Sequence, residues 1–170
     1  MQEKNRFKRL WQHWLHPRWR VERYFPSSEL KKLSDEIGKS ELTHSGEIRF
    51  VIESGYDSTD VLKGIDTRTR AWQWFGELGV WDTMSNSGVL VYVSFADHAV
   101  EIVADRGIAA KVPESEWRRV CDNMLLHFRG GDFISGLRLG LRDIGTILAR
   151  HFPQQPDSDV NELSNDVILR

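Results

Sequence analysis

Residues 88–95 read GVLVYVSF and residues 99–104 read AVEIVA, with Ala96-Asp97-His98 between them. The first run is almost entirely apolar and rich in β-branched residues, which is typical of a central strand buried on both faces. Two strands joined by so short a turn pair as an antiparallel hairpin. This stretch therefore predicts the centre of a small β-sheet.

A further strand is predicted before the hairpin, at residues 46–54 (GEIRFVIES), where apolar and polar residues alternate. Its apolar side consists of Ile48, Phe50 and Ile52. Glu53, like Glu101 in the hairpin, is interpreted as a solvated strand residue. A helix intervenes between residues 46–54 and 88–95, so the two strands are expected to run parallel.

Four segments carry apolar residues at helical spacing. In the last of them Gly136 and Gly140 lie four residues apart, which would let that helix approach its neighbour closely. The order helix, strand, helix, hairpin, helix, helix predicts an α/β fold, namely a three-layer α/β/α sandwich around a small mixed sheet with a central hairpin. The helices begin at Ser27 or Ser28, at Asp66 or Thr67, at Pro113 and at Asp132.

The two ends of the chain differ from this domain, which we place at residues 26–153. Residues 1–25 form a basic amphipathic segment: the first 24 residues carry seven Lys or Arg against two Glu, a local charge of +5. Either this helix docks on the domain, or it contacts an anionic membrane or a protein partner through residues 1–24. Residues 154–170 are polar and acidic and predict a flexible tail.

Composition excludes several classes of function. The 170 residues suit one domain, and the net charge of −2 gives no field that favours nucleic acid. One cysteine, Cys121, forms neither an internal disulfide nor a zinc cluster. The sequence contains no secretory signal, GxxxxGK loop, Gly-x-Ser-x-Gly elbow or apolar run of about 20 residues. We therefore expect a cytoplasmic protein, peripheral at the inner face of the membrane if residues 1–24 bind lipid.

A series of motifs in order identifies a family resemblance. Trp81-Asp82-Thr83 is followed by Asn86-Ser87-Gly88, by the strand to Tyr92, by residues 100–108 (VEIVADRGI) and by Gly130-Gly131-Asp132-Phe133. Over roughly residues 27–152 the chain resembles the TPM domain family, a bacterial branch of it without signal peptide or anchor. The resemblance implies an α/β/α sandwich, divalent-cation binding, often of calcium, and acid phosphatase activity. Ser87 departs from the family's usual second Asn.

The hairpin places a polar group at one end of the sheet. Because its strands are antiparallel, Asn86 at the start of the first lies beside Asp105 and Arg106 at the end of the second, with Asp82 on the approach. Oxygens of Asp82, Asn86 and Asp105 suit Ca²⁺ or Mg²⁺, and Arg106 suits a phosphate. The predicted catalytic residues are Asp82, Asp105 and Arg106. The alternative is that Asp82 and Asn86 cap turns while Arg106 pairs with Asp82 or Asp105.

Five further residues are secondary candidates. Glu41, His44 and Glu47 are expected near the same end of the sheet, although capping or packing is the favoured role for His44. Asp57 and Asp60 follow the strand at residues 46–54, at the carboxyl end where open α/β sheets usually bind ligands.

Two functions remain open from the sequence. One is a weak divalent-cation-dependent phosphatase with no organic cofactor. The alternative is a non-catalytic interaction domain that serves a membrane or envelope system, since fold alone does not decide function.

Overall fold

The computed structural model describes residues 2–154 and 163–170, with the backbone only at residues 2–6. Its sheet has the strand order β3-β2-β1-β4. The strands are β1 (Glu47–Glu53), β2 (Gly88–Ser94), β3 (Ala99–Ala104) and β4 (Ile168–Leu169). β2 pairs with β1 in parallel and with β3 in antiparallel register, so the predicted hairpin and the predicted parallel direction of β1 and β2 are confirmed. β2 is central and β3 forms an edge.

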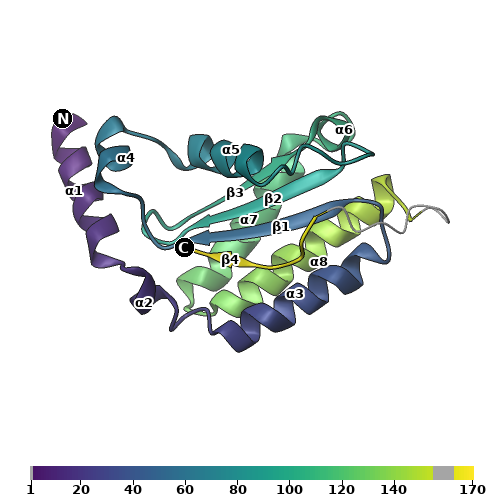
Figure 1. Ribbon diagram of the computed structural model, residues 1–170, viewed down its shortest axis with the longest axis horizontal. Coiled ribbons are helices and arrows are strands. Elements are labelled where there is room, and N and C mark those ends of the chain that lie inside the picture. The colour runs from purple at the N-terminus through teal and green to yellow at the C-terminus, as the bar shows by residue number, and fades with distance from the viewer. Residues whose placement is uncertain (1, 155–162) are drawn as a thin grey trace.

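Helices cover both faces of the sheet, as the predicted sandwich requires (Figure 1). One layer holds α3 (Ser27–Glu41), α7 (Glu114–Arg129) and α8 (Phe133–His151). The other holds α5 (Thr67–Glu77), with α4 (Ser58–Lys63) and α1 (Gln2–Leu15) beyond it. Every residue of β1 and β2 is buried between these layers. Alternate residues of each strand point to opposite faces of the sheet, so the strands contribute to two separate hydrophobic cores, one under each helical layer.

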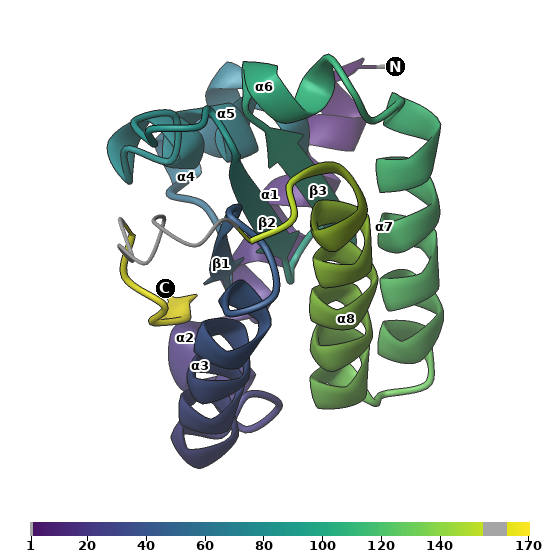
Figure 2. The ribbon, with the colours of Figure 1, turned by 90° about the vertical axis from the view of Figure 1, so that its right-hand side faces the viewer.

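α7 and α8 lie side by side along one edge of the molecule (Figure 2). A Cβ atom built at Gly136 would lie 2.5 Å from a ring carbon of Phe128, and one built at Gly140 would collide with Met124. The two glycines thus permit the close approach that their spacing predicts.

The C-terminal residues correct the prediction of a flexible tail. Ile168 and Leu169 pair with Val51 and Ile52 of β1, and the Val167 N–H donates to Ser34 Oγ at 3.2 Å. Three consecutive apolar residues, 167–169, suffice to extend the sheet by one short strand. Residues 155–162 lie outside the described part of the chain.

Three short helices were not predicted: α2 (Arg18–Val21), α4, and α6 (Arg106–Ala109). Each is shorter than two turns and carries no apolar periodicity that sequence analysis could detect. No helix within the described ranges combines the length and the apolar character needed to cross a bilayer.

Candidate functional site

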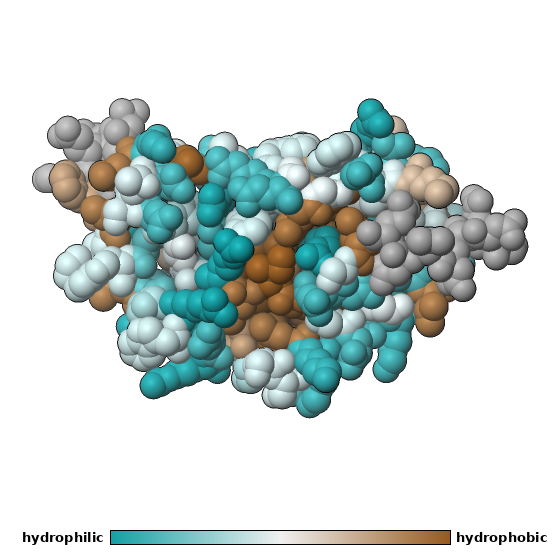
Figure 3. Space-filling model, viewed as in Figure 1, coloured by the Kyte–Doolittle hydropathy of each residue, from teal (hydrophilic) through white to brown (hydrophobic). Residues whose placement is uncertain are grey.

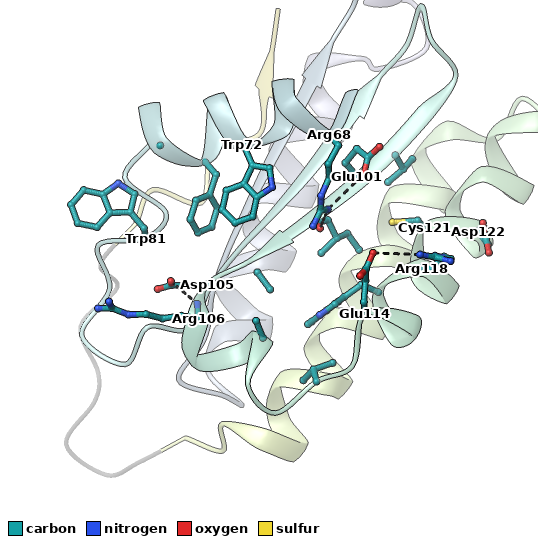
Figure 4. Close-up of a pocket in the computed structure, with 18 of the residues that line it drawn as sticks. Arg68, Trp72, Trp81, Glu101, Asp105, Arg106, Glu114, Arg118, Cys121 and Asp122 are labelled. Carbon is teal, nitrogen blue, oxygen red and sulfur yellow. Dashed lines mark hydrogen bonds and ion pairs between the residues drawn. The ribbon is translucent and has the colours of Figure 1, made fainter. Parts of the chain in front are cut away.

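A groove of about 1060 Å³ runs along the edge strand β3, between α5 on one side and α6 and α7 on the other (Figure 4). Asp105, Arg106 and Trp81 lie at one end of it, and Glu114 and Arg118 lie toward the other. The walls combine aromatic and charged side chains, which are Arg68, Trp72, Phe75, Trp81, Glu101, Asp105, Arg106, Glu114, Trp117, Arg118 and Asp122.

Side chains from the flanking helices shape the groove along β3. Arg68 at the start of α5 donates through Nη1 to the carbonyl oxygen of Ile102 at 2.5 Å. Thr67 Oγ1 donates to Glu101 Oε1 at 2.7 Å, so Glu101 is a half-buried wall of the groove, not a freely solvated strand residue. These two contacts use polar groups of β3, which is an edge strand. Unpaired backbone groups on an edge strand can pair with another chain and cause aggregation.

Asp105 is the buried acidic group of this groove, with 7% of its surface exposed. It caps α6, where Oδ1 accepts the Arg106 N–H at 2.7 Å. Oδ2 is also buried and has no hydrogen-bond partner among the described residues. A carboxylate oxygen in that state is costly to bury unless something binds it.

Asn86 and Arg106 complete the corner. Arg106 Nε donates to Asn86 Oδ1 at 2.8 Å, and the Asp105 N–H donates to the Gly88 carbonyl at 2.9 Å. Asn86 adopts a left-handed conformation (φ 50°), and a Cβ atom at Gly107 would lie 2.6 Å from the Asn86 carbonyl oxygen. The ends of the hairpin thus come together as antiparallel pairing requires, but among the described residues Arg106 pairs with Asn86 and not with a carboxylate side chain.

Asp82 lies on the loop before β2 and, like Asn86, is not among the residues that line the groove. Its side chain is exposed, whereas its neighbour Trp81 lines the groove. Its backbone N–H donates to the Gly79 carbonyl at 2.9 Å.

A cation held by protein side chains alone finds little support in this geometry. Within residues 2–154 and 163–170, no three His, Cys, Asp or Glu side chains cluster as a metal site would require. Asn86 Oδ1 already accepts from Arg106, and the buried oxygen of the corner that has no partner among the described residues is Asp105 Oδ2. That oxygen fits the other common arrangement, in which one or two carboxylates hold Mg²⁺ together with substrate phosphate oxygens.

Glu41, His44 and Glu47 form a separate polar group that does not line the groove. Glu41 Oε1 accepts the Ile48 N–H at 3.0 Å; burial, aided by the nearby Glu47, raises the pKa of Glu41 to about 7. His44 is buried beside Ser40, with Nε2 and Oγ 3.1 Å apart, and burial lowers its pKa. These contacts agree with the packing role favoured for His44.

Asp57 and Asp60 lie at the carboxyl end of β1 and do not line the groove either. Asp57 occupies the N-cap position of α4. Asp60 is 3.8 Å from Arg70 and 3.9 Å from Lys63. Cations of the protein itself thus neutralise Asp60.

The interpretation of Glu53 as a solvated residue was wrong. Glu53 is 4% exposed and accepts from Arg70 Nη2 at 2.6 Å, from the Tyr92 hydroxyl at 2.6 Å and from Trp74 Nε1 at 3.2 Å. Burial raises the pKa of Tyr92, and it raises that of the adjacent Tyr56 to about 12. α5 covers the face of β1 that carries Glu53, so both faces of the strand are buried. The predicted three-layer sandwich already implied that helices cover both faces.

Cys121 lines the groove from α7. It is partly buried against the core, and burial, followed by the charge of Glu101, raises the pKa of its thiol to about 12. A thiol in that environment is a packing group and not a nucleophile.

Fold and groove together define a small α/β/α domain with a polar corner where its hairpin ends. The family model of the TPM domain matches residues 21–147, so the chain belongs to the TPM domain family. This confirms the resemblance inferred from the motifs around Asn86 and Asp105.

Two solved structures are similar to the chain. The BA42 protein of the psychrophilic bacterium Bizionia argentinensis, solved by NMR, is 33% identical with a TM-score of 0.73, covering 84% of this chain and 92% of its own. The N-terminal domain of a protein from P. gingivalis, also solved by NMR, shares the fold at 18% identity and a TM-score of 0.58, covering 76% and 82%. A search of curated proteins gives no match.

Proposed function

We propose that this TPM domain is a weak phosphoric monoester hydrolase whose site is the corner of the groove at Asn86, Asp105 and Arg106. The observation that carries the proposal is the buried Oδ2 of Asp105, which has no hydrogen-bond partner among the described residues, in a groove that Arg106 also lines. A phosphate ester carries negative charge, which the Arg106 guanidinium attracts. Asp105 can hold the attacking water or a cation next to that phosphate.

Each residue of the corner has a distinct role in the proposed reaction. Arg106 binds phosphoryl oxygens, and its bond to Asn86 fixes the guanidinium in place. Asp105 accepts a proton through Oδ2 from the water whose oxygen attacks phosphorus. The phosphorus–oxygen ester bond breaks, and the departing oxygen takes up a proton from solvent. Asp105 then releases the proton that it accepted to solvent, which restores the site. The aromatic side chains Trp72 and Trp81 offer a surface for the organic part of the ester.

A divalent cation belongs to the same proposal. Asp105 Oδ2, with the predicted ligands Asp82 and Asn86, would hold Ca²⁺ or Mg²⁺ jointly with the substrate phosphate. Such an ion supplies positive charge to the phosphoryl oxygens. For Asn86 to take part, its Oδ1 must be shared with Arg106 Nε or released by it. Asp82 would have to reach the corner from its exposed position.

Turnover of p-nitrophenyl phosphate tests the proposal, measured with Mg²⁺, with Ca²⁺ and with EDTA. Asp105→Asn should lower kcat about 100-fold or more, because Asn keeps the cap of α6 but cannot take a proton. Asp132→Asn is the matched control: Asp132 caps α8 through the Ser135 N–H and lies outside the groove. Its turnover should equal that of the wild type.

Two results would count against this function. Equal turnover in Asp105→Asn and wild type would remove the corner as the site. Absence of turnover in purified wild type under every cation would favour the non-catalytic alternative, an interaction domain.

A further inference from the structure

We propose that α1 and α2 form a membrane-docking surface that holds the domain on anionic lipid. Its apolar part, called here the aromatic face, consists of Phe7, Trp11, Trp14 and Leu15 of α1 and Trp19 of α2. This proposal is independent of the hydrolase proposed above.

The aromatic face is exposed to an unusual degree. Phe7 is 68% exposed, Trp11 60%, Trp14 71% and Trp19 62%. Phe7, Trp11 and Trp14 are spaced by four and three residues, so they form one stripe along α1, and the Trp11 and Trp14 rings are 5.3 Å apart. Contiguous exposed apolar surface of this kind marks an interaction site. Figure 3 shows patches of brown among white and teal at the left end of the molecule, where α1 lies.

The helix that presents this face is anchored from its opposite side. Arg9 and His13 both bind Asp97, and His13 also accepts the Tyr56 N–H through Nδ1 at 2.8 Å. Leu10 packs against the core beneath α5. The two interpretations left open by the sequence are therefore compatible: α1 docks on the domain, and docking leaves its tryptophans exposed.

Charge selects lipid over an apolar protein partner. The first 24 residues carry +5, whereas the remaining 146 carry 16 Lys or Arg against 23 Asp or Glu, a charge of −7. Lys8, Arg18, Arg20 and Arg23 are exposed beside the aromatic face, and Arg23 lies 5.6 Å from the centre of the Trp19 ring. Trp with Lys and Arg is the composition that binds the interface of anionic bilayers. Repulsion of the acidic domain would orient the molecule with α1 toward the lipid.

Docking through α1 and α2 leaves the groove accessible, because no residue of the aromatic face lines it. The protein would then face the lipid with one end and the surrounding solution with the groove along β3. This arrangement predicts that lipid binding and groove chemistry can be separated by mutation.

Vesicle sedimentation tests the proposal, with equimolar phosphatidylglycerol and phosphatidylcholine as the anionic probe and phosphatidylcholine alone as the neutral one. The variant Trp11→Ser plus Trp14→Ser removes two exposed rings without touching the core. Leu42→Ser plus Leu126→Ser is the control, since these leucines are comparably exposed outside α1 and α2. Thermal melting of each variant establishes that it folds.

We expect the wild type and the leucine control to sediment with anionic vesicles at low salt, and much less with neutral vesicles or at high salt. The tryptophan variant should partition about tenfold less, because Trp contributes directly to interfacial binding. If the folded wild type stays in solution with anionic vesicles, or if the folded tryptophan variant sediments as the wild type does, the proposal is overturned. The first of these results would assign the aromatic face to a protein partner.

Discussion

Arg9 and Asp97, 88 residues apart in the sequence, form a two-point ion pair with Nε–Oδ1 at 2.8 Å and Nη2–Oδ2 at 2.9 Å. His13 Nε2 lies 3.2 Å from the same carboxylate, and its Nδ1 accepts the Tyr56 N–H, which assigns the ring proton to Nε2. Burial alone would raise the pKa of Asp97, but the bonds from Arg9 and His13 outweigh it and lower that pKa. The turn of the hairpin is thus the anchor of the N-terminal helix.

Asp97→Asn should lower the free energy of unfolding by about 2–3 kcal/mol at neutral pH, because it leaves the part-buried Arg9 without its anion. The sign of the pH dependence follows from the lowered pKa. The stabilisation is fully present above the ordinary value of 3.8 and is lost as pH falls toward the lower, folded-state pKa. Urea unfolding of both proteins at neutral pH and near pH 3 measures this. A difference that widens on acidification would contradict the assignment.

Glu41→Gln should have the opposite pH dependence. The pKa of Glu41 is raised from 4.5 to about 7, so the folded state favours the protonated form. Folding stability from this group is present below 4.5 and is lost as pH rises through about 7. Above that pH the substitution should stabilise the protein by about 2 kcal/mol, and near pH 4 it should have little effect. Equal effects at both pH values would show that Glu41 is ionised in the folded protein.

Two glycines give a matched test of the packing around β2. A Cβ atom at Gly88 would collide with the carbonyl oxygen of Val80, so Gly88→Ala should cost about 3 kcal/mol. Gly76 lies in α5 with nothing within 4 Å of such an atom, and Gly76→Ala should stabilise by about 0.5–1 kcal/mol through helix propensity. Thermal melting compares the two. A Gly88→Ala variant as stable as the wild type would mean that the loop before β2 is not the tight constraint described.

The sequence was sufficient to predict the hairpin, because the alternation of apolar and polar residues and the apolar runs that mark strands are local features. The antiparallel pairing of the hairpin then placed Asn86 beside Asp105 and Arg106. The same reasoning placed Glu53 in solvent, since the alternating pattern of β1 does not reveal that α5 covers its second face. Asp82 was grouped with Asp105 because both flank β2 and β3, but the turn at Gly79 directs its side chain outward. The groove needed long-range information: Arg68 of α5 and Trp117 of α7 line the same groove only after folding.

Cation binding can be measured separately from turnover. Millimolar Mg²⁺ or Ca²⁺ should raise the melting midpoint of the wild type, since a ligand selective for the folded state stabilises it. The variant Asp82→Asn plus Asp105→Asn should lose that shift, and Asp132→Asn should keep it. Comparison with Asp105→Asn alone then shows whether Asp82 contributes. A shift that persists undiminished in the double variant would place the cation elsewhere, with Asp57 and Asp60 as the next candidates.

The most direct test of the central claim is an amide NMR titration of the 19.7 kDa chain with phenyl phosphate and Mg²⁺. We predict that the shifts concentrate on the amides of residues 86–88 and 105–108 and on the indole N–H groups of Trp81 and Trp72. They should be lost in Asp105→Asn and retained in Asp132→Asn. Shifts that instead gather at residues 57–64 or 41–47, or that are the same in Asp105→Asn and wild type, would contradict the account.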